Sequence, residues 1–134
     1  MEFFAEHFPR VQAAARSAGR AAEAVSGAAY VTLALDADRT RAEQRLRQFL
    51  ETYYAAPAAA IMARQATYAG PIEGCVEWLQ RWIDAGARHL ALRFAGGDQL
   101  AQVADAAAHL LPRLKREPPL TYFAFRRSSS GGPA

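Results

Sequence analysis

The sequence predicts an α/β fold in which short strands alternate with amphipathic helices. Two observations carry this prediction. Runs of β-forming residues occupy 30–35 and 89–94, and the segments before, between and after them carry apolar residues at helical spacing. The predicted order is therefore helix, strand, helix, helix, strand, helix. Because connections of this kind join parallel strands, we expect the two strands to pair in parallel.

The first half of the chain supplies three of these elements. A helix is expected from 6 to 18, with Gly19 as its stop. The strand at 30–35 is apolar almost throughout, as a strand buried on both faces would be. Thr40 and Glu43 have the spacing of a capping box, in which each side chain accepts a hydrogen bond from the other residue's backbone N–H, so a second helix should begin there.

The middle of the chain contains one ambiguous stretch and one clear one. Pro57 ends the second helix, and the alanine-rich residues up to Thr67 are ambiguous, with more helix expected around 58–65. Pro71 then marks a new helix, because proline is tolerated at the first helical position, and Gly86 closes it before the second strand.

The last helix follows a glycine-rich turn at 95–98. We expect its apolar residues on one side, namely Leu100, Val103, Ala107, Leu110, Leu111 and Leu114. One domain is thus predicted from 1 to 115, followed by a tail from 116 to 134. Two strands make too small a sheet for stability, and residues 120–125 could add a third before a stretch typical of disorder.

The amino-acid composition limits the classes of protein to which this chain could belong. The chain has 134 residues, 51% of them apolar and 22% charged, which fits one globular domain. No apolar run is long enough to span a bilayer and no basic leader is present, so we expect a cytoplasmic protein with no membrane partner. A net charge of +3 is too mild to indicate nucleic acid binding. Cys75 is the single cysteine, which excludes an internal disulfide.

Several segments, in this order and spacing, resemble the C-terminal part of the luciferase-like flavin-dependent oxidoreductases. That family includes bacterial luciferase, alkanesulfonate monooxygenases and deazaflavin-dependent reductases. The segments that carry the resemblance are 8–11, 18–20, 30–36, 49–54, 68–71 and 84–94. The glycine-proline helix start at 70–73 departs from the family pattern, because it lacks the threonine or serine that many members place between the two residues.

The resemblance implies the last βα units of a TIM (β/α)8 barrel, with 30–35 as strand seven and 89–94 as strand eight. The cofactor would be reduced flavin (FMN) or deazaflavin, and the substrate a small organic molecule. A barrel of this type needs eight strands, so the resemblance also implies an incomplete barrel that is not a competent enzyme by itself.

Barrel sites lie at the carboxyl ends of the strands, which selects Asp36 and Asp38 after the first strand and 93–98 at the second. Gly96 and Gly97 could offer backbone N–H groups to a flavin phosphate, or form a plain tight turn with Asp98 as the helix cap. Arg93 could bind a phosphate or carboxylate, or pair within the protein. No set of residues identifies a catalytic group.

The remaining reactive or aromatic side chains favour structural roles. The spacing of His7, His89 and His109 indicates no metal site. Cys75 is expected to be buried, and two aromatic pairs, Trp78 with Trp82 and Tyr53 with Tyr54, are expected to pack. An alternative function is a non-enzymatic module that pairs with itself, as a homo-oligomer, or with another chain through the exposed edges of a small sheet.

Overall fold

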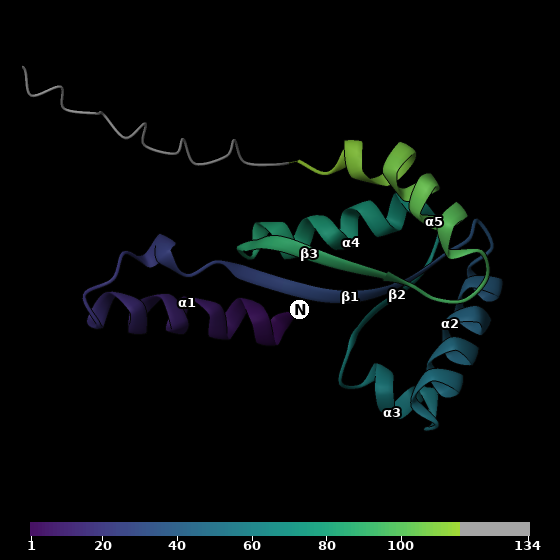
Figure 1. The fold of residues 1–134 in the computed structure, drawn as a ribbon, viewed down its shortest axis with the longest axis horizontal. Helices are drawn as coiled ribbons and strands as arrows, with labels where there is room; N and C mark the ends of the chain where they lie inside the picture. Colours follow the sequence, from purple (N-terminus) through teal and green to yellow (C-terminus); the bar gives the residue numbers. More distant parts are fainter. Residues whose placement is uncertain (116–134) are drawn as a thin grey trace, which may run out of the picture.

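The computed structural model describes residues 1–115 and shows an α/β protein with a three-stranded parallel sheet (Figure 1). The strands are β1 (Gly27–Leu35), β2 (Ala66–Gly70) and β3 (Ala87–Phe94). The helices are α1 (Glu2–Ser17), α2 (Arg39–Tyr54), α3 (Ala58–Met62), α4 (Ile72–Asp84) and α5 (Gln99–Asp105). Short 3-10 turns at Ala22–Ala24 and Leu111–Arg113 and a π-helical turn at Ala106–Leu110 complete the described elements.

The sheet has the strand order β2-β1-β3, with β1 in the centre. Both predicted strands are present and pair in parallel, as expected. The prediction of only two strands within the described residues was wrong, because β2 begins at the end of the stretch that the sequence left ambiguous, continues to Gly70 and pairs with the carboxyl half of β1. The candidate strand at 120–125 lies outside the described residues.

The third strand gave little local signal. Its five residues are alanine, threonine, tyrosine, alanine and glycine, and all but Gly70 are only partly buried, so neither alternation nor a continuous apolar run marks it. Pairing with β1 is what makes it a strand. The preceding helix α3 is real but short, at five residues.

Helices cover the two faces of the sheet in separate groups. On one face, Val31 and Leu33 of β1 pack with Cys75 and Leu79 of α4 and with Leu110. On the other face, the buried residues of α2 and α3 pack around Ala34 and Ala95; these residues are Ala42, Leu46, Leu50, Ala58 and Ile61. In Figure 1, α4 and α5 accordingly lie on one side of the strands, and α2 and α3 on the other.

Helix α2 begins with a different cap from the predicted one. The Asp38 carboxylate accepts hydrogen bonds from the backbone N–H groups of Thr40 and Arg41, at 2.9 and 3.3 Å, and so caps the helix. The predicted capping box, with Thr40 as the cap and Glu43 as its partner, is therefore wrong by two residues. Both Asp and Thr favour this position, and the carboxylate two residues earlier takes it.

The last helix also differs from its prediction. The regular helix α5 ends at Asp105 and a π-helical turn follows, which changes the side of the helix that later residues present to the core. Ala106 and Leu110 are buried, but Leu100 is 82% exposed and Val103 is 50% exposed. The single apolar stripe predicted for this segment therefore does not exist.

Helix α1 is longer than predicted and lies largely in solvent. Its aromatic residues Phe4 and Phe8 lie against Gly27 and Gly86, and Phe4 also packs on Trp82 of α4 with ring centroids 5.6 Å apart. Ala15 is its one buried residue. Among residues 1–115, no helix combines the length and apolarity needed to cross a membrane.

Candidate functional site

The carboxyl ends of β1 and β3 form the candidate site. The two strands are neighbours, and the backbone N–H of Ala95 donates to the Leu33 carbonyl at 2.7 Å, so the loops that follow them start side by side. The chain leaves β1 toward α2 on one face and leaves β3 toward α5 on the other. Ligands of open parallel sheets bind where neighbouring connections diverge in this way.

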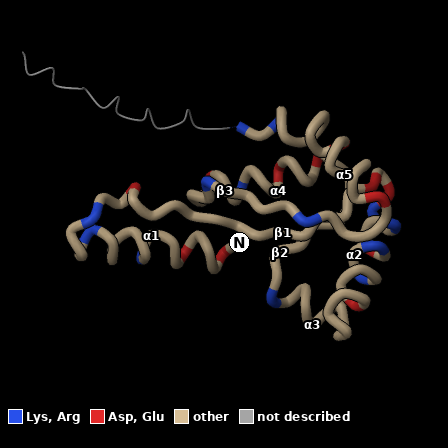
Figure 2. The backbone as a smooth tube through the Cα atoms, viewed as in Figure 1, with Lys and Arg blue, Asp and Glu red and all other residues tan. Residues whose placement is uncertain are grey.

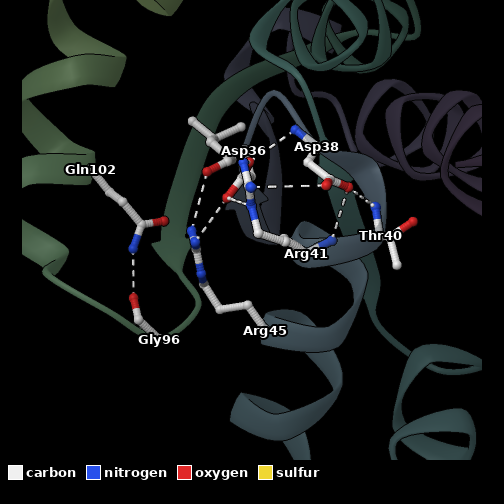
Figure 3. A network of polar contacts seen from close by, with 8 residues as sticks. Asp36, Asp38, Thr40, Arg41, Arg45, Gly96 and Gln102 are labelled. Atoms are coloured by element: carbon white, nitrogen blue, oxygen red, sulfur yellow. Dashed lines mark hydrogen bonds and ion pairs between the residues drawn. The ribbon is translucent and has the colours of Figure 1, made fainter.

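Asp36 is the centre of the charge network at this edge (Figure 3). Its carboxylate accepts from the Arg41 guanidinium at 2.8 Å and from the Arg45 guanidinium at 3.0 Å, and it also accepts from the backbone N–H of Asp38. The hydrogen bond from Arg41 is the main reason that the pKa of Asp36 falls from 3.8 to about 2. The carboxylate is thus held ionised and is fully engaged with α2.

Arg45 joins three parts of this edge. One guanidinium nitrogen donates to Asp36 and another to the Leu35 carbonyl at 3.2 Å, while the aliphatic stem lies against Gly96. A Cβ placed on Gly96 would come within 2.9 Å of the Arg45 Cγ. The glycine is therefore needed for the close approach of the arginine.

Gly96 and Gly97 form a tight turn, with φ of +64° and +65°. Asp98 follows them and accepts from the backbone N–H of Ala101 at 3.0 Å, which caps α5. Gln102 donates to the Gly96 carbonyl, and its own Oε1 is buried with no hydrogen-bond partner among the described residues (Figure 3). The geometry is that of a structural turn, and α5 has only seven residues.

Arg93 lies apart from this turn. It projects from β3 on the face opposite α4 and donates to the Thr32 hydroxyl of β1 at 2.8 and 3.1 Å. It also donates to Tyr54 at 3.0 Å and to Gln65 at 3.1 Å. Gly96, by contrast, lies against Arg45 in the middle of α2, and Gly97 lies near Gln102, so the structure does not bring the three predicted cofactor residues into one site.

Sequence reasoning missed the residues that surround Arg93. The guanidinium carbon lies 5.1 to 5.4 Å from the ring centroids of Tyr30, Phe49, Tyr53 and Tyr54. Tyr53 and Tyr54 were expected only to pack, yet they are 65% and 36% exposed. The one available signal was Tyr30 and Thr32 at alternate positions of an otherwise apolar strand, which places both on one face.

The other candidate side chains are scattered. His7 shares a hydrogen bond with the Phe3 carbonyl, and His109 lies 3.6 Å from Asp105. No group of three or more His, Cys, Asp or Glu side chains within residues 1–115 could hold a metal ion. Cys75 is fully buried, as predicted, and burial raises its pKa to about 12.

Charged residues of both signs gather where β1 and β3 end and α2 begins (Figure 2). Comparison with known proteins adds no assignment for this edge. No protein-family model matches the chain, and no curated protein matches it.

Proposed function

We propose that this chain is the C-terminal part of a luciferase-like flavin-dependent oxidoreductase and that further strands must complete its site. The observation that supports this proposal is the direct parallel pairing of β1 with β3, which is in continuous register between residues 28–33 of β1 and 89–94 of β3 and has a register shift just before them. Strands seven and eight of a (β/α)8 barrel would pair in the same way, and both would present their loops at one edge.

The present strand order sets a condition on the proposal. Consecutive barrel strands are neighbours, so strand six would pair with β1 along the edge that β2 occupies. Strand one would pair with the outer edge of β3. In a complete barrel, the segment Ala66–Gly70 would therefore leave the sheet, and helices α2 and α3 would leave the face that would line the barrel interior.

The residues present do not make a complete cofactor site. Four N–H groups of Arg93 already donate within the protein, and the turn at Gly96 packs on Arg45. The Oε1 of Gln102 is buried and has no hydrogen-bond partner among the described residues. Reduced flavin or deazaflavin would supply hydride or oxygen chemistry for a small organic substrate, and this chain would contribute part of the wall.

A chimera tests the proposal. Residues 8–114 would replace the corresponding part of an active luciferase-like reductase, and binding of reduced FMN would be followed by fluorescence. We expect the chimera to bind flavin and the isolated chain not to bind it. A folded chimera without flavin binding would contradict the family assignment, whereas micromolar binding by the isolated chain would contradict incompleteness.

Two charge variants sharpen the test. Within the chimera, Arg93→Gln is expected to weaken flavin binding, because it removes a cation from the proposed wall. Arg10→Gln is the matched control, since Arg10 is exposed on α1 and far along the chain from the proposed site. Equal affinity of both variants would remove Arg93 from the cofactor site.

A second candidate function is self-association through the sheet. The outer edge of β3 pairs with no described strand along its eight residues, and exposed Leu100 and Val103 belong to the helix that follows it. Open edges of this kind pair readily with other strands. Light scattering across a wide range of concentration tests this candidate, and a folded monomer throughout would contradict it.

A further inference from the structure

One face of the sheet is only half covered. Side chains alternate along the strands, and the register sets Tyr30 beside Ala91 and Thr32 beside Arg93 on the face opposite α4. Helices α2 and α3 bury the part of this face that contains Ala34. The part that contains Tyr30 stays open, with Tyr30 58% exposed and Ala91 exposed.

Arg93 is fixed at the border of this open part. Its Nε and Nη2 both donate to Thr32, Nη2 also donates to Gln65, and Nη1 donates to Tyr54. A guanidinium has five N–H groups, so one on Nη1 remains for an outside acceptor. We call Arg93 and the rings of Tyr30, Phe49, Tyr53 and Tyr54 the Arg93 cluster.

The charge of this cluster is not balanced within the described part of the chain. Arg41 and Arg45 pair with Asp36, and Arg113 pairs with Glu73 at 3.2 Å. Arg93 has polar and aromatic neighbours but no carboxylate within ion-pair distance among residues 1–115. A cation that is partly shielded from water by rings attracts an incoming carboxylate more strongly than a fully hydrated cation does.

We propose that the Arg93 cluster docks an extended acidic segment of another polypeptide, with one Asp or Glu side chain of that segment bound by Arg93. The cluster is open, with Tyr53 65% exposed, whereas small-molecule sites enclose most of their ligand. Tyrosine and arginine are also the residues that dominate binding energy at protein interfaces. The inference goes beyond the family proposal and concerns the chain with α2 on this face. In the complete barrel of the family proposal α2 would leave the face, so the two proposals are alternatives.

A second copy of the chain fits this face poorly. A two-fold contact centred on the cluster would bring two Arg93 guanidinium groups toward each other, and like charges at an interface cost free energy. Charge complementarity therefore selects an acidic partner.

The test is an NMR titration of the full chain with two synthetic peptides. One alternates valine and glutamate, and the other is the same peptide with glutamine in place of each glutamate. We expect the glutamate peptide to shift the amide signals of Tyr30 and Tyr54 and the Nε–H signal of Arg93. Loss of the charged hydrogen bond should weaken the glutamine peptide about tenfold.

Variants assign the effect to the cluster. Arg93→Gln should remove the preference for glutamate, Arg93→Lys should retain part of it, and Arg47→Gln, a control exposed on α2, should leave it unchanged. Tyr30→Ser should weaken binding of the glutamate peptide and leave the hydrogen bonds of Arg93 intact. This second variant tests the cluster even if Arg93→Gln does not fold. Equal affinity for the two peptides, or no binding of either, would overturn the proposal.

Discussion

The Arg45 guanidinium binds the Asp36 carboxylate at 3.0 Å and thereby fastens helix α2 to the end of strand β1. The same side chain donates to the Leu35 carbonyl and packs its stem on Gly96, at the start of the loop after β3. One arginine thus holds together the two loops that form the candidate site. Several measurable properties of the protein depend on this contact and on its surroundings.

Acid should destabilise the protein through Asp36. Its folded pKa is about 2 against an ordinary 3.8, chiefly because of the hydrogen bond from Arg41. In this range the unfolded state binds more protons than the folded state, so the stabilisation is complete above 3.8 and is lost as the pH falls through about 2. Urea unfolding at a series of pH values should show the midpoint falling more steeply in the wild type than in Asp36→Asn. Parallel curves for the two proteins would contradict this assignment.

The two glycines after β3 should tolerate alanine unequally. Both have positive φ, so alanine at either costs about 1 kcal/mol of folding free energy. Gly96→Ala also places a Cβ 2.9 Å from the Arg45 Cγ, whereas a Cβ at Gly97 meets, among residues 1–115, only the Gln102 amide nitrogen at 3.7 Å. We therefore expect Gly96→Ala to lower the denaturation midpoint more than Gly97→Ala. The difference should vanish in an Arg45→Ala background, and its persistence there would exclude Arg45 as the cause.

The end of α2 should be stabilised by a glycine. Ala55 ends this helix with φ of +50°, a left-handed conformation that glycine adopts without strain. Ala55→Gly is expected to raise the free energy of unfolding by about 1 kcal/mol, measured by chemical denaturation. Ala56→Gly is the control, since Ala56 does not have positive φ and packs against the core, and it should lower stability.

The single thiol should be inert in the folded protein. Cys75 is fully buried, and desolvation raises its pKa to about 12, so the reactive thiolate is rare at neutral pH. Ellman's reagent should therefore label native protein slowly and unfolded protein at once. Rapid complete labelling of the native chain would show that α4 opens readily from the sheet.

Local sequence signals identified most of the elements. The helix that ends before Gly86 and the strand that follows it form as predicted, because an amphipathic face, a proline start and a glycine stop all lie within the segment. The burial of Cys75 and of residues 31–35 was also predictable, since both follow from apolar neighbours in the sequence, but Tyr30 at the start of the predicted strand is 58% exposed. The barrel, the flavin and the cytoplasmic location remain predictions.

The contacts of Arg93 could not be predicted from local sequence patterns. Its hydrogen-bond partners are Thr32, Tyr54 and Gln65, which are 61, 39 and 28 residues away in sequence. No pattern within a window of a few residues relates these positions. Local patterns also failed to identify the cap of α2, because Asp38 and Thr40 are both suitable cap residues. The path of the chain after β1 places Asp38 at the cap position.

The sequence by itself determined the order of the helices and of the strands β1 and β3, and the parallel direction of these two strands, because periodicity, caps and stops act between near neighbours. Tertiary structure alone decided that Ala66–Gly70 is a strand, that β1 is central and that Arg93 and Gly96 lie in different places. These features depend on backbone pairing and side-chain contacts between segments that are distant in sequence. Such contacts stabilise the protein only after the sheet has formed.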